Sequence, residues 1–294
     1  MQYLIDASVY VFRAYYSIPD DMVDDSGNPI NALYGFCRFL GDFMEQVKPE
    51  RIAVLFDESL STSFRTEIYP EYKANRDPAP PELRRQFVQC RRFARALGLM
   101  ECAQPGYEAD DLIGTLVATG RKKGIPSTVV SRDKDLAQLI EKNDVFWDFA
   151  GKGKINYDGI PEHFGVWPEQ VADFLALAGD AVDNIKGVPG VGKKTATALL
   201  QHFGSLEKLY DGLDAVHEVN VRGAKTLALK LAAHKEDALL ARRLTGIACD
   251  APIDQPKTGL RPTAPNLGNI NALYDEAGIG MALRRQAERV SDLF

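Results

Sequence analysis

The chain has 294 residues, 45% of them hydrophobic and 26% charged, which is typical of a folded globular protein with one large or two modest domains. No apolar run approaches the ~20 residues that a membrane-spanning helix needs, and Asp6 interrupts the N-terminal apolar segment. We therefore expect a cytoplasmic protein with no signal peptide and no membrane contact. The four cysteines have no CxxC spacing, which predicts reduced thiols and disfavours a zinc site.

The N-terminal part of the sequence predicts alternating strands and helices. Residues 2–6 have the pattern of a short buried strand, and a helix or loop carrying Arg13 follows at the same edge. Residues 33–47 have helical periodicity, and Pro49 then precedes a strand at 51–57. This alternation indicates an α/β fold with a mostly parallel sheet flanked by helices.

Basic and aromatic residues interleave between positions 64 and 76, ahead of a proline-rich loop. Rings beside cations suit stacking and charge contacts with single-stranded nucleic acid. A mobile surface loop with extended side chains explains the same pattern, so both interpretations stay open at this point. A helix with apolar residues at 87, 88, 93 and 97 follows and ends at Gly98.

An acidic sequence at 106–111, Gly-Tyr-Glu-Ala-Asp-Asp, begins the next predicted helix, 109–119. Acidic side chains in the first turn stabilise the positive end of the helix dipole, which explains one or two of the three carboxylates. A strand at 126–131 follows. Segments 145–149 and 154–157, separated by glycines, predict a hairpin.

Further carboxylates follow the apolar runs of three predicted strands: Asp6, Asp57, and Asp133 with Asp135. Sites in an open α/β sheet form at the carboxyl ends of the strands, so these side chains and the acidic helix start are expected to converge. A site of carboxylates without histidine selects hard cations such as Mg²⁺ or Mn²⁺. The sequence therefore predicts a metal site, and two such ions can catalyse phosphodiester hydrolysis.

From about residue 160 the pattern becomes mostly helical, with a helix from Pro168 to Ala178. Asp180 and Asp183 follow three residues apart, a spacing that on a helical turn would place both on one face. Residues 250–268 form a connection rich in proline and glycine, and one last helix is predicted at 269–290.

The glycine-rich segment 187–195 has the spacing of a P-loop, but two features exclude that interpretation. Lys194 stands where Ser or Thr should bind magnesium, and the preceding segment is predicted to be helical. We favour a helix-hairpin-helix, in which exposed N–H groups and a helix N-terminus hold a phosphate. Lys193 and Lys194, together with Arg222 and Lys225, would add charge, and a plain αα-hairpin is the alternative.

The net charge of −6 does not exclude a polyanionic partner. Nine of the acids belong to the predicted site, and the rest of the chain has 32 acidic against 35 basic residues. Bound divalent cations would cancel much of the local negative charge.

Taken together and in this order, the motifs resemble the 5′-nuclease (flap endonuclease) superfamily, especially its bacterial 5′→3′ exonuclease branch, over residues 3–245. The motifs are Ile5-Asp6-Ala-Ser-Val-Tyr10-Val-Phe-Arg13, Phe56-Asp57, Phe64-Arg65 with Tyr72-Lys73-Ala-Asn-Arg76, Gly106 to Asp111, Ser131 to Asp135, Gly179 to Ile185 and Gly187 to Gly192. The resemblance implies a PIN-like or resolvase-like α/β domain at 1–163 with an arch or clamp around 68–90. It also implies a helix-hairpin-helix DNA-binding domain at 164–250, and residues 251–294 form a C-terminal extension.

The resemblance also implies roles for individual residues. The metal carboxylates fall on Asp6, Asp57, Glu108, Asp110, Asp111, Asp133, Asp135, Asp180 and Asp183. The basic residues at the reacting phosphate fall on Arg13, Lys73 and Arg76, with Arg65 beside them. The DNA contacts fall on Tyr72, Gly187, Val188, Gly190, Gly192, Lys193 and Lys194, and hairpin carbonyls can hold K⁺.

These features predict a structure-specific 5′→3′ exonuclease and flap endonuclease that acts on DNA with 5′ flaps, nicks or free 5′ ends. Two alternatives stay open: a non-catalytic binder of branched nucleic acid, and a PIN-like nuclease directed at RNA. Two positions depart from the superfamily pattern, because Ala7 and Arg132 stand where glycine is usual. Arg132 could turn inward and pair with Asp133, or point outward or toward phosphate.

Overall fold

The computed structural model describes residues 1–294 except 59–62, 150, 152 and 255–257. Its centre is a six-stranded sheet in the order β3-β2-β1-β4-β5-β6, in which only the last pair is antiparallel. The strands are β1 (Gln2–Asp6), β2 (Ile52–Leu55), β3 (Met100–Cys102), β4 (Ser127–Val130), β5 (Val145–Asp148) and β6 (Gly153–Asn156). The predicted α/β class is therefore confirmed. β3 is an additional strand that sequence periodicity did not reveal, because three residues are too few to show a period.

One face of the sheet is covered by α1 (Ala7–Ser17), α2 (Asn31–Val47) and α4 (Pro81–Ala96). Their apolar residues pack in one buried cluster with strand side chains such as Ile5 and Val54. α2 ends at Lys48, which has a φ of 48° and lies just before Pro49. A left-handed residue ahead of proline ends a helix, since neither can continue it.

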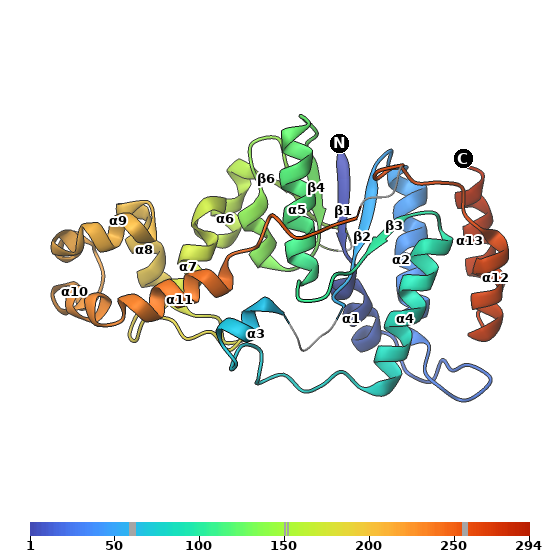
Figure 1. Ribbon diagram of the computed structural model, residues 1–294, viewed down its shortest axis with the longest axis horizontal. Helices are drawn as coiled ribbons and strands as arrows, with labels where there is room; N and C mark the ends of the chain where they lie inside the picture. The colour runs from blue at the N-terminus through green and yellow to red at the C-terminus, as the bar shows by residue number, and fades with distance from the viewer. Residues whose placement is uncertain (59–62, 150, 152, 255–257) are drawn as a thin grey trace.

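The other face is covered by α5 (Ala109–Lys122), which packs with Leu4 and Val129 of the sheet in a second buried cluster. This cluster continues without a break into the helical lobe drawn at the left of Figure 1. The lobe contains α6 (Ile160–Phe164), α7 (Val171–Ala178), α8 (Lys193–Phe203), α9 (Leu206–Asp211), α10 (Ala224–Ala233) and α11 (Lys235–Thr245). No described helix is both long and apolar enough to cross a membrane.

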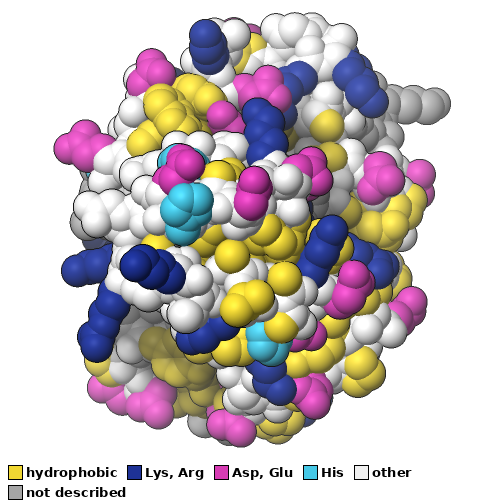
Figure 2. All heavy atoms as spheres, turned by 90° about the vertical axis from the view of Figure 1, so that its left-hand side faces the viewer, with side chains coloured by type: hydrophobic (Ala, Val, Ile, Leu, Met, Phe, Trp, Pro, Cys, Tyr) yellow, Lys and Arg dark blue, Asp and Glu magenta, His cyan; other side chains and the backbone are white. Residues whose placement is uncertain are grey.

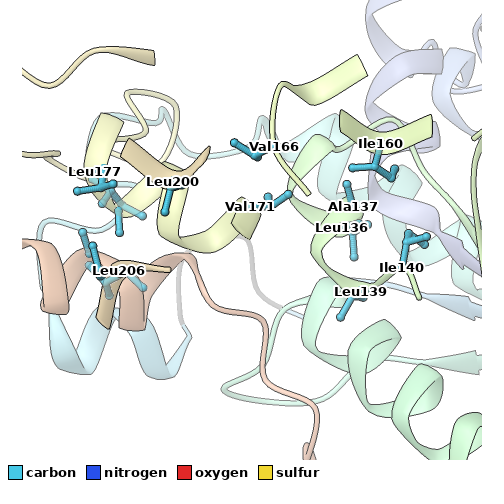
Figure 3. Packing of buried hydrophobic residues seen from close by; sticks show 14 of the residues in the cluster. Leu136, Ala137, Leu139, Ile140, Ile160, Val166, Val171, Leu177, Leu200 and Leu206 are labelled. Carbon is cyan, nitrogen blue, oxygen red and sulfur yellow. The ribbon is translucent and has the colours of Figure 1, made fainter. Parts of the chain in front are cut away.

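Figure 3 shows how the two lobes share a core. Leu136 and Leu139, from the short 3-10 helix η1 (Lys134–Leu139), lie toward Val171 at the start of α7, and Leu177, Leu200 and Leu206 extend the same cluster into the helical lobe. The loop that carries Asp133 and Asp135 is therefore anchored by the contact between the lobes. The division into domains at residue 163 stays a prediction.

The C-terminal segment runs back from the helical lobe across the sheet lobe (Figure 1). The Ile52 amide donates to the Leu260 carbonyl at 2.8 Å, and the Thr263 amide donates to Gly98 at 2.9 Å. The segment ends in two helices, α12 (Leu267–Glu276) and α13 (Met281–Ser291), which pack on α4 and α2. The single helix predicted at 269–290 is therefore wrong, because Gly278 adopts a φ of 65° and separates the two.

One further prediction is corrected. Asp180 and Asp183 do not lie on a helical turn; they lie in a tight loop that is closed by mutual backbone hydrogen bonds between Asp180 and Ile185, at 2.9 and 2.7 Å. The range 68–90 of the predicted arch includes the first part of α4, whose residues Phe87 and Phe93 are buried against α1 and α12, and the arch itself stays a prediction. The segment between α3 (Phe64–Ile68) and α4 has no helix of its own.

Candidate metal centre

Parallel strands deliver three carboxylates to one edge of the sheet. Asp6 ends β1 and caps α1, where its Oδ1 accepts from the Val9 amide at 3.4 Å and the side chain is buried. Asp57 follows β2 and accepts a hydrogen bond from the Ala109 amide at 2.9 Å. Asp133 follows β4 and accepts from the Asp135 amide at 3.0 Å. The backbone therefore fixes each carboxylate, which suits ligands that must keep their positions.

Ser131 links the Asp6 carboxylate to the backbone of Asp133, and sequence analysis did not single it out as a site residue. Its hydroxyl donates to Asp6 Oδ2 at 2.7 Å and accepts from the Asp133 amide at 2.9 Å. The signal for it was its place between a strand and Asp133, but a serine after a strand is too common to single out.

The start of α5 contributes two more carboxylates, Glu108 and Asp110. Glu108 is the N-cap residue of the helix, and its Oε2 accepts from Lys73 Nζ at 2.7 Å and from the Tyr72 hydroxyl at 3.2 Å. Asp110 lies two residues further along, in the first turn of α5, where burial and then the charges of Asp133 and Asp6 raise its pKa. The helix start thus faces the strand ends, as the sequence predicted.

The loop between Asp180 and Ile185 brings Asp183 to the same place. Its Oδ2 accepts from the Tyr72 hydroxyl at 3.0 Å and lies 3.7 Å from Lys73 Nζ, and the guanidinium of Arg76 pairs with Oδ1. Asn75 donates to the Ala181 carbonyl at 2.9 Å. Residues 72–76 and the 180–185 loop therefore form one connected rim of the site.

Burial and mutual repulsion raise the pKa values of most of these acids. For Asp6, burial and the charge of Asp57 raise the pKa to about 7, against the opposing hydrogen bond from Ser131. For Asp135, burial and Asp133 raise the pKa to about 8. Burial is likewise the main cause of the raised pKa of Asp110, where Asp133 adds repulsion.

Two groups of the cluster are kept charged by each other. Burial pushes the pKa of Glu108 upward, but the charges of Lys73 and Arg65 outweigh it and hold the pKa below its ordinary value. Burial lowers the pKa of Lys73, but the negative charges of Glu108 and Asp183 raise it by more, so the net change is upward. The cluster thus contains more negative charge than its own cations neutralise, which favours a bound cation.

This donor set fits divalent metal ions. In the contacts given above every acceptor is an oxygen, and no histidine or cysteine of the described residues takes part, which is the chemistry that Mg²⁺ and Mn²⁺ prefer. Among the described residues, no group of three or more His, Cys, Asp or Glu side chains stands close enough together to hold a metal ion. Several of the carboxylates are instead engaged by backbone amides, by Ser131 and by Lys73.

Comparisons with known proteins decide the family. Residues 1–165 match the family described as "5'-3' exonuclease, N-terminal resolvase-like domain", and residues 166–267 match "5'-3' exonuclease, C-terminal SAM fold". The chain belongs to the 5′-3′ exonuclease family. The curated "5'-3' exonuclease" of Buchnera aphidicola is 35% identical over 252 residues, which are 85% of this chain and 87% of the relative.

Longer relatives and solved structures agree with this family. "DNA polymerase I" of Pseudomonas aeruginosa is 41% identical over 274 residues, but the match covers 93% of this chain and 30% of the relative. The chain thus spans about a third of the length of these polymerase relatives. The solved structure "Divalent metal ions (zinc) bound to T5 5'-exonuclease" has a TM-score of 0.67 at 19% identity and covers 99% of this chain and 98% of its own. The catalytic core of Rad2 in complex with DNA has a TM-score of 0.65 at 15% identity, with coverage of 100% and 92%. At these identities the likeness concerns the fold.

Arg65 and Asp111 are paired with each other. They form a buried bidentate pair, with both N–O distances 2.8 Å and with 3% and 0% of the side chains exposed. Arg65 also donates to the carbonyls of Leu244 and Gly246 at 2.8 Å, and Asp111 accepts from the Ala248 amide at 2.9 Å. The pair thus ties α3, α5 and the end of α11 together, and a role of either residue at the reaction site stays a prediction.

Tyr72, which is predicted as a DNA contact, is buried in the structure. Only 5% of its surface is exposed, and its hydroxyl donates to Glu108 and Asp183. A buried ring cannot stack on a base, so Tyr72 supports the carboxylates. Arg13 is half-buried on α1 and forms no ion pair with any described residue, which leaves its guanidinium available.

Arg132 pairs with Asp148 and with none of the predicted metal ligands among the described residues. Its Nε lies 3.3 Å from Asp148 Oδ2, and half of its side chain is exposed. The inward pairing with Asp133 is therefore wrong, and the outward alternative holds.

The glycine hairpin at 187–192 joins α7 to α8 in a tight crossing. A Cβ on Gly187 would lie 2.3 Å from the Gly179 amide nitrogen, and Val188 is buried with its amide bonded to the Leu177 carbonyl at 2.9 Å. Gly190 has a φ of 85°, which a residue with a side chain rarely adopts. Val188 thus fixes the hairpin on the core, and its own side chain cannot contact a ligand.

α8 then begins at Lys193 after Gly192, and no side chain caps the first turn. Lys193 and Lys194 are exposed there. On the lobe face drawn in Figure 2, basic side chains are interspersed with acidic and apolar ones. A phosphate contact in this lobe is therefore expected at the uncapped helix start, where amides and lysines coincide.

Proposed function

We propose that the chain is a structure-specific 5′→3′ exonuclease and flap endonuclease that hydrolyses DNA phosphodiester bonds. The observation that carries the proposal is the convergence of the strand-end carboxylates, the acidic start of α5 and Lys73 at one edge of the sheet. Family membership supports the same reaction class. We place the enzyme in the bacterial cytoplasm, where its DNA substrate lies.

Eight carboxylates are the proposed ligands of two Mg²⁺ ions, with Mn²⁺ as a substitute: Asp6, Asp57, Glu108, Asp110, Asp133, Asp135, Asp180 and Asp183. When bound, the ions would activate water and stabilise the attacking and leaving oxygens of an in-line displacement. The raised pKa values of Asp6 and Asp135 support this assignment, because a metal would stabilise the charged forms that burial disfavours. Asp111 is left out because Arg65 and two backbone amides already satisfy its carboxylate.

Lys73 and Arg76 are the proposed electrophilic groups. Both lie on the rim of the carboxylate cluster, and both are bound to acids that metal ions would engage. Once those acids bind metal, the two cations can turn to the phosphoryl oxygens and neutralise the charge that grows in the transition state. Arg13, which is free on the α1 side, would approach the same phosphate.

The helical lobe is proposed to hold duplex DNA without reading its sequence. The amides at the start of α8 with Lys193 and Lys194 would contact phosphates, and carbonyls of the 187–192 hairpin would accept K⁺. The segment 69–80 would pass over the single 5′ strand. The proposed substrates are duplexes with 5′ flaps, nicks or free 5′ ends.

A cleavage assay tests the proposal. The substrates are a 5′-labelled flap, a nicked duplex and the same flap with an RNA strand, each in Mg²⁺ and in EDTA. We expect Mg²⁺-dependent release of short 5′ products from the DNA substrates, and loss of that activity in Asp110→Ala while the melting temperature persists. Cleavage in EDTA, or full activity of Asp110→Ala at saturating Mg²⁺, would contradict the metal mechanism. Preference for the RNA strand would favour the PIN-like alternative.

A further inference from the structure

The pair Arg132–Asp148 lies at the sheet edge between β4 and β5, beside the carboxylate cluster. Arg132 stands between Ser131, which donates to Asp6, and Asp133. The two side chains meet through Arg132 Nε and Asp148 Oδ2 at 3.3 Å. Arg132 is therefore a cation within one residue of two groups that belong to the reaction site.

Arg132 is held by charge alone. No described residue accepts a hydrogen bond from its guanidinium, and its side chain is 50% exposed. Such half-exposed pairs contribute at most about 1 kcal/mol to stability, so the fold gains little from this arginine. The guanidinium N–H groups other than Nε–H bond no described residue and are available to a ligand.

Asp148 is the more buried partner of the pair. Its side chain is 18% exposed, and Oδ1 is buried without a hydrogen-bond partner among the described residues. Arg132 is therefore the partner that a ligand can reach more easily.

The pair lies close to Tyr10 on α1. The Phe149 amide, which follows Asp148 in the chain, donates to the Tyr10 hydroxyl at 3.3 Å. Burial is the main cause of the raised pKa of Tyr10, Asp148 raises it further, and Arg13 lowers it, which places Arg13 in the same neighbourhood. Lys73, instead, contacts Glu108 on α5, which covers the other face.

We infer that Arg132 is a substrate-binding residue that contacts a backbone phosphate next to the scissile one, on the α1 side of the site. Asp148 holds the guanidinium near this position until DNA arrives, and the phosphate then replaces the single ionic contact with a bidentate one. Arginine suits this exchange because its planar donors match phosphate geometry. The inference rests on the proposed function, since it needs DNA in the carboxylate cluster.

The experiment measures binding of a fluorescent 5′-flap duplex in EDTA, over a range of salt concentrations, with Arg132→Ala, Arg132→Lys and Asp148→Asn. Arg38→Ala is the matched control, because Arg38 is also an exposed arginine whose Nε faces an aspartate, at 3.9 Å, but on α2. For Arg132→Ala we expect roughly three- to tenfold weaker binding at low salt, with a salt slope smaller by about 0.7–0.9. Arg132→Lys should restore the slope, and Asp148→Asn should bind as tightly as the parent or more tightly.

The two variants of the pair thus have opposite expected effects, which separates substrate binding from a structural role. If Arg132→Ala and Asp148→Asn both lower the melting temperature and leave affinity and slope at the level of Arg38→Ala, the inference is overturned. If the parent itself neither binds nor cleaves the flap, the proposed function fails as well. If the parent cleaves and the double change Lys193→Ala with Lys194→Ala weakens binding while Arg132→Ala does not, only this inference fails.

Discussion

Replacing Arg65 by methionine tests whether this residue supports the fold or the chemistry. The change removes two hydrogen bonds of 2.8 Å to Asp111 and those to the carbonyls of Leu244 and Gly246. It also leaves the Asp111 carboxylate, which is 0% exposed, without its counter-charge. Methionine fills similar space, so the loss is electrostatic and not a cavity.

The expected cost is large. Removing one partner of a buried ion pair destabilises a protein by about 3–5 kcal/mol, because the remaining charge is uncompensated. At roughly 2–4 °C per kcal/mol for a chain of this size class, the melting temperature of Arg65→Met should fall on the order of 10 °C. Thermal unfolding followed by circular dichroism measures this, alongside single-turnover cleavage well below the transition.

Arg92→Met is the matched control. Arg92 also forms a bidentate pair, with Glu276 at 2.7 and 2.9 Å, but 43% and 50% of these side chains are exposed. Such a pair contributes less than about 1 kcal/mol, so this variant should melt close to the parent. An Arg65→Met protein that melts like the parent but no longer cleaves would refute the structural role and restore Arg65 as a phosphate contact.

Three other predictions follow from the charges. Asp183→Asn should bind flap DNA more tightly than the parent in EDTA and cleave it far more slowly in Mg²⁺. Like charges at ~4 Å repel by about 4 kcal/mol at a protein surface, and the change also frees Lys73 and Arg76, which are bound to Asp183. Equal or weaker binding of the variant in a filter-retention assay would contradict this prediction. The double change Lys193→Ala with Lys194→Ala should weaken duplex binding. It should also reduce the slope of log affinity against log salt concentration by about 0.9 for each phosphate that the variant no longer neutralises. An unchanged slope would exclude these lysines as phosphate ligands. Hydrogen bonds from Arg289 and Arg92 lower the pKa values of Glu45 and Glu276 from 4.5. The stability that these two pairs give to the fold is therefore fully present above pH 4.5 and is lost as the pH falls through the lowered pKa values. Hydrogen exchange should then show α12 and α13 loosening first in acid, and this early loosening should already be present at neutral pH in Glu45→Gln with Glu276→Gln.

The sequence by itself determined the fold class and the edge of the sheet at which the site lies. Parallel strands end at a common edge, so an aspartate after an apolar run has a predictable place wherever that strand pairs. Asp6, Asp57 and Asp133 satisfy this rule, and hydrogen bonds to neighbouring backbone amides fix all three. The same logic applies to Glu108, because a helix start after a strand also faces that edge.

Only the tertiary structure decided which charged residues serve the site and which serve the core. Arg65 and Asp111 stand in motifs beside true members of the cluster, and nothing local distinguishes them. Their pairing depends on Leu244, Gly246 and Ala248, which lie more than 130 positions from Asp111 in the chain. A charge is buried or exposed according to what packs over it from elsewhere in the chain, and sequence periodicity near the residue does not contain that information.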